Sequence, residues 1–149
     1  MSEHTYDIAI IGGGPAGLSA ALTGRIRNKD IVIFERSEFS AKLQSTHLVD
    51  NYLGMPQITG KGMMQCFSAH ALSLNPTLIK DKVVNIFPGD TFTLLTPTQV
   101  FTAKAVIIAA GAEHKKLGVP GEKRLAGRGI SYCATCDGAF YKKKVTAVI

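Results

Sequence analysis

Two cysteines separated by two residues, Cys133 and Cys136, are the part of this sequence best suited to chemistry. Thiols at this spacing can close into a small disulfide that forms and opens reversibly, and the attacking species in the exchange is the thiolate. Asp137 follows the second cysteine and could pass a proton during exchange, although an Asp-Gly pair is equally typical of a tight turn. The pattern predicts a redox couple, with Asp137 as a candidate proton donor.

A zinc site is the alternative interpretation of such a cysteine pair. Structural zinc takes four ligands, often supplied as two pairs. The other candidate ligands do not stand at paired ligand spacing; they are Cys66, His4, His47, His70 and His114. We therefore predict no metal. Cys66 falls in a helical pattern, and we expect it to be a packed, unreactive thiol, because free cysteines are usually buried.

A glycine-rich loop near the start of the chain predicts a dinucleotide site. Residues 6–11 end in an apolar run typical of a buried parallel strand, and the glycines that follow open a helix. Gly12 permits a tight turn, Gly14 lets the backbone approach a pyrophosphate, and Gly17 lets the helix pack close to the strand. The helix N-terminus offers N–H groups to phosphate. Glu35, at the end of the next strand, can accept hydrogen bonds from ribose hydroxyls.

Composition and charge narrow the class of protein. A chain of 149 residues, 46% of them hydrophobic, can bury one core but hardly two complete domains. The net charge of +6 lies entirely within residues 115–149. Basic residues can attract nucleic acid, but these have no interleaved aromatics, so we interpret them as a solvated loop and expect no nucleic-acid partner.

No apolar run approaches the roughly 18 residues of a membrane span, and no secretory signal is visible. We expect no membrane partner and a reducing, cytoplasmic location.

The order of the predicted elements indicates an α/β fold. Strands over 6–11 and 31–34 flank a helix and form a βαβ unit. Residues 60–74 have helical periodicity, with Met63, Phe67 and Ala71 on the apolar face. Further along the chain we expect a strand over residues 78–86, a hairpin over 92–103 and a buried strand over 105–110. We then expect a flexible connection over 120–129 and one more buried strand over 145–149.

Several strings together resemble the low-molecular-weight thioredoxin reductases, flavoproteins with two dinucleotide-binding domains. The resemblance is strongest in the string GRGISYCATCDG, and it covers essentially the whole chain but only the first half of a family member. The strings that carry it lie at residues 11–18, 51–54, 105–112, 117–122 and 127–138.

This resemblance implies an incomplete Rossmann-like, three-layer, FAD-binding fold with a β-meander. Residues 1–114 would be the N-terminal part of the FAD-binding domain. Residues 115–149 would hold the hinge, the cysteine pair and the first strand of an NADPH-binding domain. The resemblance implies that FAD is bound by Gly12, Gly14, Pro15, Ala16, Gly17, Glu35, Asn51, Ala110 and Gly111.

The resemblance also implies a route for electrons. They would pass from NADPH, in the intact parent, to FAD, then to the Cys133–Cys136 disulfide, and then to thioredoxin or a similar disulfide protein. Cys136 would be the thiol nearer the flavin, Cys133 would attack the disulfide of thioredoxin, and Asp137 would be the proton donor. Members of the family are usually homodimers, which implies the same for the intact protein.

The sequence departs from the family's pattern in several places. Ser40, Ala41, Lys42 and Leu43 stand where members usually show Gly-Gly-Gln-Leu, and Ala110 replaces a frequent threonine. The family's second glycine loop is not present, so we expect little NADPH-driven turnover from these 149 residues. Two alternatives stay open: a ferredoxin-driven or peroxidase-linked flavin disulfide reductase, and a non-catalytic flavin-binding remnant.

Overall fold

The computed structural model describes residues 4–149, and of Thr135 and Cys136 it describes the backbone alone. Two compact units follow one another along the chain. The first ends at Gly111 and the second comprises Ala112–Ile149. None of the helices in the part of the chain that the structure describes combines the length and the apolar character that crossing a membrane requires.

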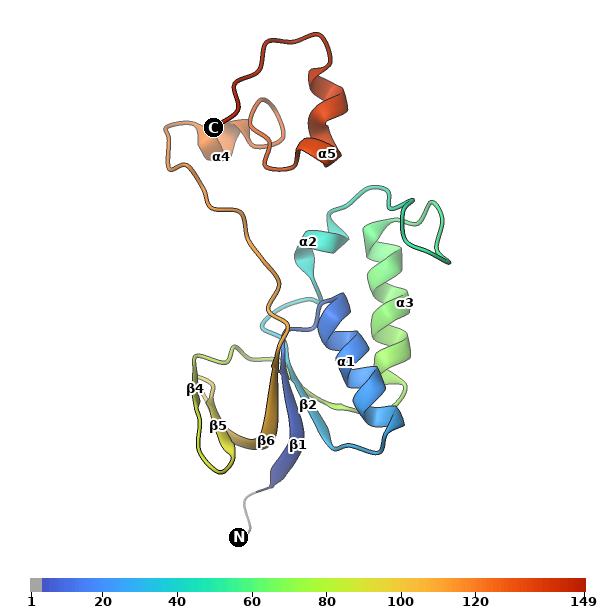
Figure 1. Ribbon diagram of the computed structural model, residues 1–149, viewed down its shortest axis with the longest axis vertical. Helices are drawn as coiled ribbons and strands as arrows, with labels where there is room; N and C mark the ends of the chain where they lie inside the picture. Colours follow the sequence, from blue (N-terminus) through green and yellow to red (C-terminus); the bar gives the residue numbers. More distant parts are fainter. Residues whose placement is uncertain (1–3) are drawn as a thin grey trace. The chain divides into compact units, whose positions relative to one another are not determined.

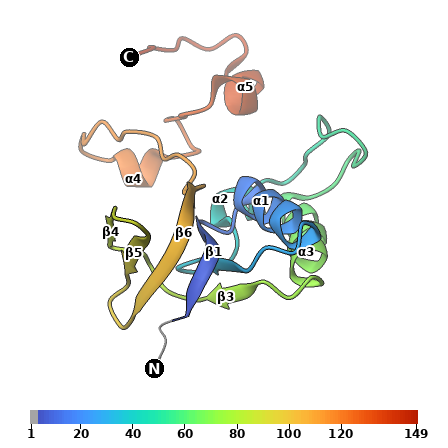
Figure 2. The ribbon, with the colours of Figure 1, turned by 60° about the horizontal axis from the view of Figure 1, so that its bottom comes forward.

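A six-stranded sheet is the frame of the first unit, with strand order β3-β2-β1-β6-β5-β4 (Figure 2). Its central strand β1 pairs in parallel with both β2 and β6, and β2 pairs in parallel with β3. The antiparallel meander β4-β5-β6 completes the sheet. The strands are β1 (Thr5–Ile11), β2 (Ile31–Phe34), β3 (Thr77–Ile79), β4 (Asn85–Phe87), β5 (Phe92–Leu95) and β6 (Val100–Ile108).

Helices pack on one face of this sheet, where Figure 1 shows α1 and α3 side by side. The helices of the unit are α1 (Pro15–Ile26), α2 (Ala41–Gln44) and α3 (Gly60–Leu72). Helix α1 is the crossover between parallel strands β1 and β2, as a βαβ unit requires. The Thr59 hydroxyl caps α3 by accepting a hydrogen bond from the N–H of Gly62 at 3.1 Å.

Successive residues of β1 and β2 enter two different cores, because side chains alternate between the faces of a strand. Toward the helices, Ile10 and Ile33 pack with Leu18 and Met64. Toward the opposite face, the buried core residues Ala9, Val32, Phe34, Leu94 and Ala103 pack together. Both faces of β1 and β2 are covered, so the sequences of these strands contain continuous apolar runs and do not alternate between apolar and polar residues. The βαβ unit, the helix and the mixed α/β class are confirmed.

Three predicted strands differ in the structure. The strand expected over 78–86 is split into β3 and β4, and the chain between them bends at Asp81, whose side chain ends in a hydrogen-bonded carboxylate. That carboxylate accepts hydrogen bonds from the Lys82 N–H at 2.7 Å and from the Thr98 hydroxyl at 2.9 Å. Conversely, the segments expected over 100–103 and 105–110 merge into the single strand β6, which ends at Ile108. Lys104 lies within β6, and its ammonium group pairs with the Asp7 carboxylate at 2.7 Å.

Burial along β6 and α3 is lower than predicted. Ile108 near the end of β6 is 72% exposed, since nothing in the described part of the first unit covers that end of the strand. The prediction that Cys66 is a buried thiol is wrong: Cys66 is an exposed free cysteine. Helix α3 turns Met63, Met64 and Ala71 toward the core and leaves Cys66 on its solvent side.

The second unit consists of loops and short helical turns. These are α4 (Glu122–Leu125), α5 (Ala134–Asp137) and a 3₁₀ turn at Gly138–Tyr141. The strand predicted over 145–149 is wrong for this structure, where these residues are unpaired and Val145, Val148 and Ile149 are exposed. A parallel strand needs a neighbouring strand for its hydrogen bonds, and the second unit, as described, contains none.

Candidate functional site

The glycine loop between β1 and α1 is held tightly at both of its ends. Gly12 has φ +108°, and a Cβ there would lie 2.4 Å from the carbonyl oxygen of Ala109 on β6's continuation. The N–H of Gly12 donates to the carbonyl of Phe34 at 2.9 Å, which ties the loop to β2. A Cβ on Gly17 would lie 1.9 Å from the carbonyl oxygen of Gly12. Two of the predicted glycines therefore serve the fold of the loop itself.

Gly14 differs from these two glycines because its surroundings are open. The nearest atom to a Cβ built there is the Cβ of Ser40, 4.0 Å away, and its φ of −73° suits any residue. Gly14 is also the N-cap of α1, which has no side-chain cap and begins with Pro15. The loop thus presents a bare backbone and free space at a helix N-terminus, which fits the diphosphate of a dinucleotide.

Glu35 reaches the same loop from the end of β2. Its Oε2 accepts a hydrogen bond from the N–H of Gly13 at 2.8 Å, and its Oε1 accepts one from the N–H of Ser37 at 3.2 Å. A carboxylate has about four lone-pair sites, so acceptor capacity is left for a ribose hydroxyl. The structure therefore brings Glu35 to the loop from which it is separated by more than twenty residues.

The continuation of β6 forms the other side of the loop. The N–H of Ala109 donates to the carbonyl of Ile11 at 2.8 Å, and the Cα of Ala110 lies 3.2 Å from the position of a Gly12 Cβ. Gly111 has φ +73° in open surroundings. Asn51 lies exposed on the loop between α2 and α3, so its role near a flavin stays a prediction.

Two residues beside the loop were given no role by the sequence analysis. The ring of Phe39 packs so close to Gly13 that a Cβ on that glycine would lie 2.4 Å from the ring's Cδ1. Ser40, the N-cap of α2, has φ +45°, in the left-handed region that favours glycine. The sequence did contain a signal for Ser40, because Ser40 and Ala41 replace the Gly-Gly of the resembled family. This replacement puts a side chain at a position whose backbone is left-handed.

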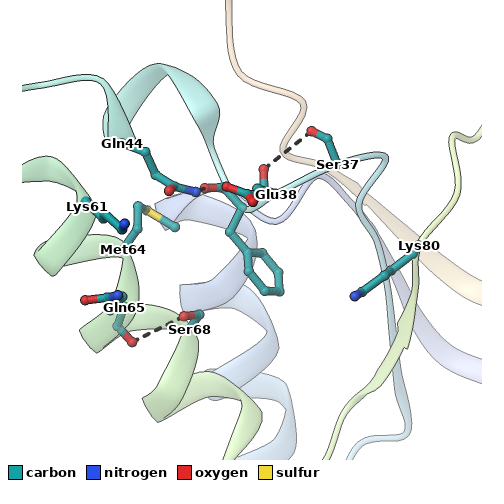
Figure 3. A pocket seen from close by; sticks show the side chains of 9 residues that line it. Ser37, Glu38, Gln44, Lys61, Met64, Gln65, Ser68 and Lys80 are labelled. Atoms are coloured by element: carbon teal, nitrogen blue, oxygen red, sulfur yellow. Dashed lines mark hydrogen bonds between the residues drawn. The ribbon is translucent and has the colours of Figure 1, made fainter.

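A pocket of about 270 Å³ lies next to this region, between α3 and the loop that follows β2 (Figure 3). Lys61, Met64 and Gln65 line it from α3, and Lys80 lines it from the end of β3. Its other lining residues are Ser37, Glu38, Phe39, Gln44 and Ser68. None of the predicted cofactor-binding residues lines this pocket. We place the candidate cofactor site at the glycine loop, because that is where bare backbone and an acceptor carboxylate meet.

The cysteine pair lies in the second unit, at the start of α5. Cys133 is disulfide-bonded, and the side chain of Cys136 lies outside the described residues, so their mutual pairing stays a prediction. The N–H of Asp137 donates to the carbonyl of Cys133 at 3.0 Å and closes the turn that contains the pair. Asp137 is half-buried, and its Oδ2 accepts a hydrogen bond from the Ser131 hydroxyl at 2.7 Å.

A buried carboxylate anchors the segment that precedes Cys133. Glu122 is 7% exposed and accepts hydrogen bonds from the N–H of Leu117 at 3.0 Å and that of Gly118 at 2.7 Å. The Tyr132 hydroxyl also donates to Glu122, and the Tyr132 ring stacks on His114 with centroids 5.7 Å apart. The sequence analysis missed Glu122, Tyr132 and Ser131, because no motif signals a partner that only folding brings close.

Comparisons with known proteins find relatives that match almost the whole of this chain. Thioredoxin reductase of Bacillus subtilis (strain 168) is 40% identical over 148 residues, which are 99% of this chain and 47% of that protein. The thioredoxin reductase structure from Streptococcus pyogenes MGAS5005 is 39% identical with a TM-score of 0.81, over 94% of this chain and 46% of that one. A ferredoxin-flavin thioredoxin reductase structure from Clostridium acetobutylicum is 41% identical with a TM-score of 0.72, over 93% and 48%.

The chain spans about half the length of the curated relatives it matches. These likenesses confirm the predicted resemblance and the Rossmann-like class of the fold. A family profile described as pyridine nucleotide-disulphide oxidoreductase matches residues 6–149. The chain therefore belongs to the pyridine nucleotide-disulphide oxidoreductase family.

Proposed function

We propose that this chain is the N-terminal part of a flavin-dependent disulfide reductase that acts on thioredoxin or a similar disulfide protein. The observation that carries the proposal is the presence, in one chain, of an open dinucleotide loop and a disulfide-bonded Cys133 beside Asp137. The first unit would belong to the FAD-binding domain and the second to the NADPH-binding domain. Relatives named thioredoxin reductase match the chain from end to end, which supports this assignment.

The glycine loop and Glu35 would hold FAD. When bound, FAD would accept electrons from a one- or two-electron donor and pass two of them to a disulfide. The backbone N–H groups at the start of α1 would bind its diphosphate, and Gly14 would leave the space for it. Glu35, fixed by the N–H of Gly13, would accept hydrogen bonds from the ribose hydroxyls and disfavour a 2′-phosphate there.

The cysteine pair would perform the exchange with the protein substrate. Reduction breaks the bond between Cys133 and Cys136 and yields two thiols, and Asp137 would supply one of the protons. In the reduced state, the Cys133 thiolate attacks one sulfur of the substrate disulfide and forms a mixed disulfide. Cys136 then attacks Cys133, which releases the reduced substrate and restores the original disulfide.

The electron donor is a separate part of the proposal. NADPH is the donor that the family resemblance implies. Reduced ferredoxin is a second candidate, favoured by the 41% identity with a protein named ferredoxin-flavin thioredoxin reductase. To distinguish the two donors, each is mixed with the protein in its full natural length, which is called the full-length protein below. The true donor is the one that bleaches the absorbance of the flavin.

A reductive titration tests the proposal. The full-length, FAD-loaded protein should take up about twice the reducing equivalents of its Cys133→Ser variant, because a dithiol stores as many electrons as a flavin. Cys66→Ser serves as the matched control, since it removes an exposed thiol and should leave the uptake unchanged. Equal uptake by the wild type and Cys133→Ser, or no retained FAD, would contradict the proposal.

A further inference from the structure

Ser131 connects the backbone of the reactive cysteine to the carboxylate beside it. Its hydroxyl donates to Oδ2 of Asp137 at 2.7 Å and accepts a hydrogen bond from the N–H of Cys133 at 3.1 Å. The same hydroxyl lies 3.3 Å from the carbonyl oxygen of Cys133. Asp137 in turn donates its own N–H to that carbonyl oxygen at 3.0 Å. One half-buried side chain thus bridges both ends of the turn that contains the cysteine pair.

From this geometry we propose that Ser131 is a positioning residue that holds Asp137 ready to exchange a proton with the cysteine pair. The inference rests on the proposed function and assigns a role that the sequence pattern did not. Reduction of the disulfide breaks the S–S bond and adds two electrons to the two sulfurs, and a bound FAD would supply these electrons. The departing sulfur takes a proton from the Asp137 carboxyl group, which becomes a carboxylate. When the substrate disulfide takes up the two electrons and the cysteine pair closes again, this proton returns to Asp137, and the released substrate sulfur takes a proton from solvent.

The contacts of Ser131 suit both protonation states of Asp137. A hydroxyl has one hydrogen to donate and two lone pairs that accept. When Asp137 is ionised, the hydroxyl donates to Oδ2, the shorter of its two possible donor contacts. When Asp137 is protonated, its O–H can donate to the Ser131 oxygen, and the serine hydrogen turns to the carbonyl of Cys133. No buried polar group loses its partner as the proton moves, which keeps the carboxyl group in one place.

An alanine cannot make any of these contacts, and a carboxylate without them is free to rotate away from the turn. General acid–base catalysis typically contributes about 10²–10⁴-fold to a rate, and it requires the acid to lie within hydrogen-bond reach of its target. Loss of the positioning contact should therefore remove part of this rate enhancement. In a protein whose Asp137 cannot donate a proton, loss of the same contact should not change the rate.

The test measures flavin-to-disulfide electron transfer in the full-length, FAD-loaded protein by rapid mixing. The isosteric pair Ser131→Thr and Ser131→Val separates the hydroxyl from the shape of the side chain. We expect Ser131→Val to slow the transfer by about tenfold or more and Ser131→Thr to stay within about threefold of the wild type. Equal slowing by both variants would overturn the inference, because the hydroxyl would not matter.

A double-variant comparison with Asp137→Asn supplies a readout that a merely structural serine would not change. If Ser131 acts through Asp137, Ser131→Val should slow transfer by less than about twofold in the Asp137→Asn background. The same factor in both backgrounds would overturn the inference while leaving the proposed function intact. Absence of electron transfer in the wild type would overturn the proposed function and this inference together.

Discussion

The N–H of Gly13 and the Oε2 atom of Glu35 are 2.8 Å apart, and this hydrogen bond joins the glycine loop to the end of β2. It places a carboxylate beside the predicted diphosphate site and fixes its orientation. The second oxygen is held as well, by the N–H of Ser37. Glu35 is therefore set in place before any ligand arrives, which lowers the ordering cost of binding.

Replacing Glu35 by leucine should weaken FAD binding in the full-length protein by about tenfold or more, because a hydrogen bond to a charged group contributes about 1.5–3 kcal/mol. The dissociation constant is measured by the fluorescence of flavin titrated onto the apoprotein. Glu38→Leu is the matched control, since this exposed carboxylate lies three residues further along the same loop. An unchanged constant in Glu35→Leu would place the adenosine ribose elsewhere.

The same substitution at two glycines should separate folding from binding. In Gly17→Ala the new Cβ meets the Gly12 carbonyl oxygen at 1.9 Å, so we expect the free energy of unfolding to fall by about 3 kcal/mol or more. In Gly14→Ala the new Cβ meets nothing closer than 4.0 Å, so the apoprotein should lose about 1 kcal/mol or less. The Gly14 variant should nevertheless bind FAD poorly, because the methyl group fills the open side of the loop.

Thermal unfolding of the apoproteins and their flavin content after saturation and desalting are the two measurements. A Gly14→Ala protein that keeps FAD as well as the wild type would contradict the proposed position of the diphosphate. A Gly17→Ala protein as stable as the wild type would mean that the turn can shift without cost.

Removal of Glu122 should loosen the segment that leads to Cys133. Glu122→Ala leaves the N–H groups of Leu117 and Gly118 and the Tyr132 hydroxyl without their acceptor, at a cost of about 1–3 kcal/mol for each that stays buried. Tyr132→Phe removes a single donor and should cost less. Hydrogen exchange at Leu117 and Gly118 should accelerate by about tenfold or more in Glu122→Ala and by clearly less in Tyr132→Phe. Equal exchange in both variants would show that Glu122 does not hold this segment.

Asp7 should make the stability of the full-length protein sensitive to acid. The backbone N–H of Asp30, and after it the Lys104 ammonium group, hold the pKa of Asp7 below its ordinary value of 3.8. A carboxyl group whose pKa is lower in the folded state stabilises that state fully above its unfolded pKa. The contribution is lost as the pH falls through the folded pKa. Asp7→Asn should therefore lower Tm at neutral pH, and its difference from the wild type should shrink below about pH 4.

Circular dichroism at a series of pH values measures this difference in Tm. Lys104→Gln should reproduce a smaller part of the loss, because the Asp30 N–H is the larger cause of the shift. A difference between wild type and Asp7→Asn that stays constant as the pH falls would contradict the assignment.

Local sequence patterns were sufficient to predict the βαβ unit and the glycine loop, and they also predict the cysteine pair as a redox element. Each of these depends on residues close together in the chain: glycine next to an apolar run, or two thiols two residues apart.

The tertiary structure alone decided which distant groups meet and which residues are covered. Glu122 meets Tyr132, and Cys66 lies exposed on α3, although nothing in the neighbouring residues signals either of these relationships. Residues 145–149 have the apolar pattern of a strand, yet a strand exists only where another strand accepts its hydrogen bonds. Periodicity expresses the preference of a segment for a conformation, whereas partners and burial depend on what the rest of the chain brings beside it.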